Sequence, residues 1–146
     1  MPRRLEVVFT RFTNTGGQSP VSISGTLVQT VLAELHSLRD KVTGLTDSAV
    51  ASVDGMLIAS DTDEVRPDVL AALAAAALGL GKSTSKEVGM GELREVVTRC
   101  QSGHIVVYAI AGSELLVILG DEGLDITRLH LESRPAVVRL REVLGD

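Results

Sequence analysis

The Gly81-Lys82-Ser83 triplet is the part of this sequence whose residue types most resemble a chemical site. A phosphate-binding loop has the pattern G-x-x-x-x-G-K-[ST], in which backbone N–H groups, the lysine and the hydroxyl hold the phosphates of a nucleotide. Here Ala76 stands where the first glycine belongs. Such a loop also opens a helix, whereas the alanine- and leucine-rich run before Gly79 predicts that a helix is ending. We therefore interpret the triplet as a helix terminus with glycines in capping positions.

The other chemically suggestive residues are scattered. Asp121 and Glu122 follow the apolar run LLVILG, so an NTP-binding enzyme built on the triplet and one of these carboxylates is an alternative function. His36, His104 and His130 lack the spacing of metal ligands. We expect no catalytic residue, no metal site and no cofactor.

Length and composition indicate one domain inside the cell. A chain of 146 residues can bury one hydrophobic core but not two independent ones. The longest apolar run, residues 69–80, is shorter than the roughly 20 residues that span a membrane, and the first residues lack a signal-peptide core. Cys100 is the single cysteine, which excludes an internal disulfide and suits a reducing compartment. We expect a cytoplasmic protein without a membrane span.

Charge is unevenly distributed along the chain. Residues 1–25 carry a net charge of +2, whereas the remainder carries −7 and has Tyr108 as its one aromatic residue. An acidic body with so few aromatic side chains disfavours a nucleic-acid partner. Within residues 1–25, LEVVFTRF alternates like a short strand and TNTGGQSP is typical of a loop. We interpret residues 1–25 as an extension that docks on another surface, with the domain itself as a candidate, and residues 26–146 as the domain. The alternative is that the extension is weakly ordered.

Hydrophobic periodicity predicts the elements of that domain. A helix is expected from a cap at Ser24 to Gly44, because its apolar residues fall on one helical face. SAVASVDGMLIAS predicts a β-hairpin at 48–60 with a two-residue turn at Asp54-Gly55. A second helix begins near Pro67 and ends near residue 80.

The second half of the chain predicts three strands and a helix. ELREVVTRC, HIVVYAIA and ELLVILG indicate an antiparallel meander, and residues 124–144 have helical spacing that Pro135 must kink or split. The order of elements is therefore α-ββ-α-βββ-α, which is an α+β fold.

This order and several segments resemble the Roadblock (dynein light chain) domain family, in particular its bacterial members. The resemblance covers roughly residues 26–144 and rests on SAVASVDGMLIAS, DVLAALAAAALGLG, GMGELREVV, HIVVYAIAGSELLVILGDE and LDITRLHLESRPAVVRL. It implies a five-stranded antiparallel sheet with the second helix on one face and the terminal helices on the other. It also implies a non-enzymatic homodimer that regulates a small Ras-like GTPase or acts as a scaffold, with a scaffold lacking a GTPase partner as a further alternative.

The residues of the second helix independently favour a dimer. That helix is apolar nearly all round, so one sheet face cannot cover it, and its small alanines permit close approach of a twin helix across a two-fold axis. The alternative is a helix buried wholly within its own chain. The stripe expected at the interface is Leu70, Leu73, Ala74, Ala77 and Leu80.

The strand ELREVVTRC supplies a second expected contact. The resemblance places this strand at the sheet edge, paired with its twin across the dimer axis. Antiparallel pairing centred on Val97 sets Glu95 opposite Arg99 of the second chain, so that opposite charges face each other twice. The alternative is that both side chains face water and the register is set elsewhere.

Overall fold

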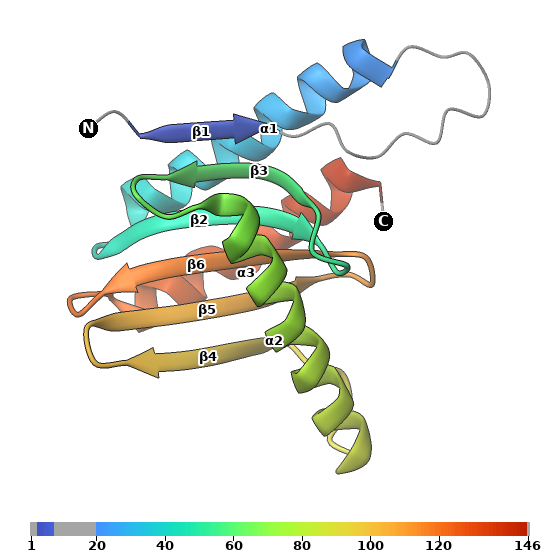
Figure 1. The fold of residues 1–146 in the computed structure, drawn as a ribbon, viewed down its shortest axis with the longest axis vertical. Helices are drawn as coiled ribbons and strands as arrows, with labels where there is room; N and C mark the ends of the chain where they lie inside the picture. The colour runs from blue at the N-terminus through green and yellow to red at the C-terminus, as the bar shows by residue number, and fades with distance from the viewer. Residues whose placement is uncertain (1–2, 8–19, 146) are drawn as a thin grey trace.

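Six antiparallel strands form one sheet in the computed structural model, which describes residues 3–7 and 20–145 (Figure 1). The order across the sheet is β1-β3-β2-β6-β5-β4. The five predicted strands are confirmed, and β1 adds a sixth at the edge beside β3. The strands are β1 Arg4–Val7, β2 Leu45–Ser52, β3 Leu57–Thr62, β4 Glu95–Cys100, β5 Gly103–Ile110 and β6 Glu114–Asp121.

Three helices cover the two faces of the sheet, as expected. Helix α2 (Pro67–Glu87) crosses one face, and helices α1 (Pro20–Lys41) and α3 (Ile126–Leu144) lie on the other (Figure 1). Because side chains alternate along a strand, one strand contributes residues to the cores on both faces of the sheet. In β5, Val106 belongs to the core under α1 and α3, whereas Val107 belongs to the core under α2. The element order α-ββ-α-βββ-α is thus confirmed for the domain.

The ends of two helices differ from the predictions. Helix α2 continues to Glu87 rather than ending near residue 80, so Gly79 and Gly81 lie inside it. A Cβ at residue 81 would stand within 3 Å of the Leu93 and Val96 side chains, so this glycine lets the returning chain pack against the helix. Helix α1 begins at Pro20, before the cap expected at Ser24.

The β2–β3 hairpin has a four-residue loop instead of the predicted two-residue turn. The Ser52 N–H donates to the Met56 carbonyl at 2.9 Å, and the Met56 N–H donates to the Ser52 hydroxyl at 3.1 Å. Gly55 has a φ of +92°, but Asp54 does not share the left-handed conformation that a type I′ turn requires at both central residues. The side-chain bonds of Ser52 therefore favour the longer loop.

Helix α3 is not split at Pro135, which lies inside it. Proline removes the hydrogen bond to the carbonyl of residue 131. Both Pro135 and Leu131 are exposed, so water can reach that carbonyl and the interruption costs less than it would in the core. The helix begins at a cap in which Asp125 accepts a hydrogen bond from the Arg128 N–H at 3.0 Å.

The first residues of the chain belong to the same sheet as the domain. Strand β1 pairs antiparallel with β3, with Arg4 opposite Thr62 and Val7 opposite Ala59. The strand expected in LEVVFTRF is therefore present over residues 5–7, and the rest of that segment and the predicted loop lie outside the described residues. The division of the chain at residue 25 stays a prediction.

Candidate functional site

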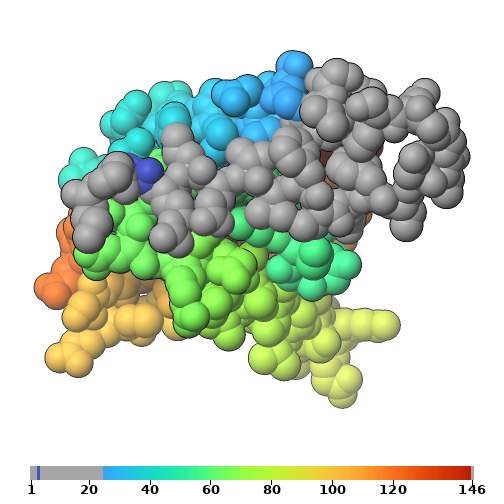
Figure 2. Space-filling view, turned by 45° about the horizontal axis from the view of Figure 1, so that its top comes forward, coloured from blue at the N-terminus to red at the C-terminus, as the bar shows by residue number. Residues whose placement is uncertain are grey.

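The last turns of α2 extend beyond the sheet that supports the rest of the helix. The helix has 21 residues, which span about 32 Å, and its last buried residue is Leu78. Beyond Leu78 it passes the edge strand β4, and its end projects from the molecule together with the following loop (yellow-green in Figures 1 and 2). The Ser85 hydroxyl donates to the Gly91 carbonyl at 2.6 Å and holds that loop against the helix. The overhanging turns therefore have an ordered shape without a sheet beneath them.

The outer side of α2 carries an exposed apolar stripe. Leu73 and Leu80 are two turns apart and are 64% and 71% exposed. Ala76 is exposed between them and Ala77 is half-buried. The stripe therefore combines large apolar side chains with small ones that permit close approach of another surface.

The structure divides the five residues predicted for the α2 interface between two sides of the helix. Leu70 and Ala74 are buried against the chain's own sheet. Leu73, Ala77 and Leu80 remain on the outer side. The α2 contact that we propose with a second copy therefore consists of Leu73, Ala77 and Leu80 together with the exposed Ala76.

Strand β4 lies at the far edge of the sheet from β1 and pairs within the described chain only with β5. Val97 is 49% exposed, and Arg99 and Cys100 are exposed. An uncovered edge with an apolar residue at its centre is a template for pairing with another strand. Its three predicted interface residues, Glu95, Val97 and Arg99, share one face because they alternate along the strand.

Glu95 is linked to helix α3 by a polar chain. Its Oε2 atom lies 3.7 Å from Nδ1 of His130, and that nitrogen lies 2.9 Å from the Tyr108 hydroxyl. Burial raises the pKa of Tyr108 to about 12, opposed in part by Ser133 and Arg134, and the Glu95 charge adds to the rise. The phenol therefore keeps its proton at neutral pH. This series of polar contacts ties β4 to β5 and to α3. Sequence reasoning missed it because Glu95, Tyr108 and His130 are far apart in the sequence.

The Gly81-Lys82-Ser83 triplet lies within α2 and not at its end, so the interpretation as a helix terminus was wrong. The helical conformation does not form the turn of a phosphate-binding loop. The structure also keeps the triplet away from Asp121. Lys82 lines a groove beneath the overhanging turns, near Ala109 at the end of β5, whereas Asp121 pairs with Gly103 at the beginning of that strand.

Replacement of Lys82 tests the nucleotide-binding alternative. We expect wild-type protein and Lys82→Ala to show the same absence of saturable ATP or GTP binding in isothermal titration calorimetry. The free energy of unfolding should differ by less than about 0.5 kcal/mol, because a surface substitution away from a cap or a core contact has little effect. Binding by the wild type that Lys82→Ala abolishes would restore the enzyme hypothesis.

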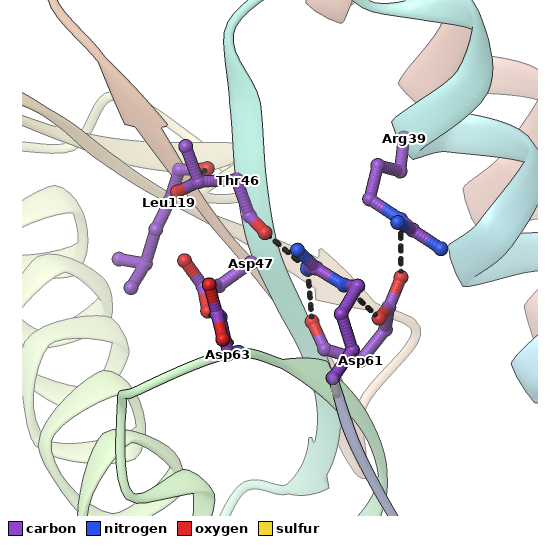
Figure 3. Close-up of polar contacts among 7 residues, drawn as sticks. Arg39, Thr46, Asp47, Asp61, Asp63 and Leu119 are labelled. Carbon is purple, nitrogen blue, oxygen red and sulfur yellow. Dashed lines mark hydrogen bonds and ion pairs between the residues drawn. The ribbon is translucent and has the colours of Figure 1, made fainter. Parts of the chain in front are cut away.

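A buried carboxylate on β3 forms a second polar cluster (Figure 3). Asp61 is completely buried, and its Oδ2 atom lies 2.8 Å from Nε of Arg39 on α1. Its Oδ1 atom lies 2.7 Å from Nε of Arg3, which also donates to the carbonyls of Asp61 and Thr46. Two guanidinium groups from separate parts of the chain thus neutralise one carboxylate.

Sequence reasoning missed this cluster, although one signal was available. Asp61 follows Ala59 with period two, so an aspartate is in phase with a residue of the core under α1 and α3. A buried carboxylate requires a cation beside it. Its two arginines come from positions 3 and 39, and that distance along the chain hides the pairing from any local pattern.

The part of the chain that the structure describes holds no group of three or more histidine, cysteine, aspartate or glutamate side chains arranged for a metal ion. Among the same residues, no helix is both long enough and apolar enough to cross a bilayer.

Comparisons with known proteins identify the fold. The family model described as the Roadblock/LC7 domain matches residues 31–120. The uncharacterized protein MJ1340 of Methanocaldococcus jannaschii is 28% identical over 116 residues, which cover 79% of this chain and 97% of that protein. A crystal structure of a Roadblock/LC7 domain from Streptomyces avermitilis is 26% identical with a TM-score of 0.73, covering 78% and 97% of the two chains. Myxococcus xanthus MglB is 16% identical with the same TM-score, covering 79% and 94%, and this second structure supports the fold alone.

Proposed function

This chain belongs to the Roadblock/LC7 domain family, and from that premise we propose that it is a non-enzymatic, cytoplasmic homodimer that regulates a small Ras-like GTPase or serves it as a scaffold. The observation that carries the homodimer is the combination of an overhanging α2 with an open β4 edge beside it. A second copy related by a two-fold axis would supply a sheet beneath the overhang and a strand for the edge at the same time.

The exposed residues of α2 support this assembly. Leu73 and Leu80 lie on the outer side, and burying such side chains contributes about 1.5–3 kcal/mol each. Ala76 and Ala77 would let the axes of twin helices come close together. The same stripe in a monomer would leave a line of apolar surface in water, which is typical of an interaction site.

The direction of backbone hydrogen bonds supports pairing of β4 about Val97. The Ala109 N–H donates to the Arg94 carbonyl at 3.2 Å. Because inward and outward groups alternate in an antiparallel strand, residues 95, 97 and 99 direct their N–H and C=O groups away from β5. A twin strand must therefore pair odd residues with odd residues. Competing registers then differ by two residues, and only the one centred on Val97 sets Glu95 opposite Arg99 of the second copy.

Charge reversal tests that register. We expect Glu95→Arg and Arg99→Glu each to weaken the dimer about 2- to 30-fold, since two symmetric cross-strand pairs contribute roughly 0.2–1 kcal/mol each. The double variant should recover much of the loss, because it restores opposite charges in the reverse order. The dimer dissociation constant can be measured by sedimentation equilibrium.

Glu64→Arg is the matched control for that experiment, since it makes the same charge change at an exposed residue that follows β3, away from the β4 edge. It should leave the dissociation constant within about twofold of wild type. A double variant that is no tighter than the weaker single variant would contradict the Val97-centred register.

The GTPase partner is supported by membership of the Roadblock/LC7 family. The test is capture of a tagged full-length chain from its native host, followed by mass spectrometry of the bound proteins. A small Ras-like GTPase should be captured, and its rate of GTP hydrolysis or nucleotide exchange should change when the purified chain is added. Capture of partners without any GTPase would favour the alternative of a scaffold that lacks one.

A further inference from the structure

The edge of β3 is occupied by the first residues of the chain itself. Strand β1 pairs with β3 over four residues, from Arg4 opposite Thr62 to Val7 opposite Ala59. In a sheet ordered β1-β3-β2-β6-β5-β4, this edge is the one farthest from β4. Whatever binds beside β3 therefore does not compete with the proposed dimer contact.

Charge selects what can bind at this edge. Asp61 is completely buried in the middle of the paired stretch, opposite Leu5. Arg39 reaches one carboxylate oxygen from α1, and Arg3 reaches the other from the residue just before β1. A buried carboxylate that loses one of its partners is strongly destabilised. An extended segment beside β3 is therefore favoured when it brings an arginine in the place of Arg3.

The resident strand is held by few contacts. It contributes four paired residues along one side of β3, whereas every other strand of the sheet has six or eight residues. Arg3 adds charge-assisted hydrogen bonds to Asp61 and also donates to the Thr46 carbonyl on β2. Its side chain is one-quarter exposed, so solvent and competing groups can reach it. The Arg3–Asp61 contact therefore requires a cationic side chain, and an arginine of another segment can replace Arg3.

We propose that the β3 edge is a binding site for an extended peptide segment that carries an arginine immediately before its paired stretch. The chain's own residues 3–7 fill the site, and a partner protein binds by displacing them with a segment of the same chemistry. Strand addition supplies the backbone hydrogen bonds, and the Asp61 carboxylate supplies the specificity. This interaction differs from the proposed dimer and GTPase roles and does not depend on them.

The experiment uses the full-length chain with Arg3→Glu, in which a second carboxylate faces Asp61 and disfavours docking of the resident strand. The probe is a synthetic peptide of residues 1–10, MPRRLEVVFT, with a fluorophore at its C-terminus. By fluorescence anisotropy, the peptide should bind this variant saturably and at least tenfold more tightly than it binds wild type, whose site is filled. The same peptide with Arg3→Ala should bind the variant at least tenfold more weakly.

Hydrogen exchange measures the edge without a ligand. In the Arg3→Glu chain, those amides of residues 59–62 that face β1 should lose protection and regain it when the peptide is added, whereas the amides that face β2 should stay protected. Amides of residues 115–118, in the centre of the sheet, should stay protected, which establishes that the variant is folded. If Arg3→Glu disturbs the whole sheet, the milder Arg3→Ala replaces it with the same expected pattern. Arg11→Glu makes the same charge change elsewhere in the N-terminal segment and should behave as wild type.

Three results would overturn the proposal. The first is unchanged protection of the amides of residues 59–62 that face β1 in the folded Arg3→Glu chain. The second is equal affinity of the peptide for wild type and variant. The third is equal affinity of the variant for the peptides with and without the arginine.

Discussion

Leu80→Glu is expected to convert the protein into a folded monomer at micromolar concentration. Leu80 is 71% exposed in the single chain, so a glutamate there is solvated and should leave the stability of the monomer nearly unchanged. In the proposed dimer the same carboxylate would be buried between twin helices without a cation. Leaving a buried charge unpaired costs about 3 kcal/mol or more, which corresponds to more than a hundredfold weaker dimer.

Leu131→Glu is the matched control for this prediction. Leu131 is 61% exposed on α3, which lies on the opposite face of the sheet from α2. The substitution is chemically identical and should leave the dimer intact. Mass in solution, measured by light scattering after size exclusion over a range of concentrations, separates the two variants.

Two outcomes would contradict the α2 contact. A wild-type chain that stays monomeric across the micromolar range would remove the dimer altogether. A dimeric wild type with a dimeric Leu80→Glu variant would place the interface elsewhere, and the charge reversals on β4 would then identify whether that strand alone carries it.

Arg39→Leu is expected to lower the free energy of unfolding by about 3 kcal/mol. The substitution leaves one oxygen of the completely buried Asp61 without its cation. Breaking a buried pair by removing one partner typically costs 3–5 kcal/mol, and the lower end applies because Arg3 still pairs with the other oxygen. For a domain of this size, the melting temperature should fall by about 6–12 °C.

Arg139→Leu shows how much of that effect is due to burial. Arg139 makes a bidentate pair with Glu34, with distances of 2.6 and 3.0 Å, but its side chain is about half exposed. Its loss should cost no more than about 1 kcal/mol, since exposed ion pairs contribute little. Chemical denaturation of both variants gives the comparison. Equal losses would mean that the Asp61 cluster contributes no more to stability than a surface pair.

The meander and the two-layer core were predictable because their signals are local. Val106 and Val107 sit next to each other in a strand-like run, and alternation alone sends them into the cores on opposite faces of the sheet. Pro67 marks the start of α2 for a similarly local reason, because proline is tolerated in the first turn of a helix. The expected end of α2 was wrong, because Gly81 lies inside the helix, where the absence of a side chain lets Leu93 and Val96 pack against it.

The candidate site was predicted only in part, because periodicity does not show which side of an apolar helix its own sheet covers. Leu70 and Leu73 are both apolar and lie one turn apart, yet the first is buried in the chain and the second faces outward. In the same way, the charges of Glu95 and Arg99 suggested a register, but the hydrogen bond from Ala109 to Arg94 is what indicates which backbone groups of β4 are free to pair.

The sequence by itself determined the order of the elements, the family to which they belong and the acidic, aromatic-poor composition of the domain, since each depends on neighbours in the chain or on residue counts. Only the tertiary structure decided that α2 overhangs the sheet, that β1 adds itself to β3, and that Asp61 is buried between Arg3 and Arg39. These features depend on which distant segments meet. A buried carboxylate such as Asp61 pairs with the cations that the fold brings close to it, and the spacing of residues in the sequence does not predict which cations these are.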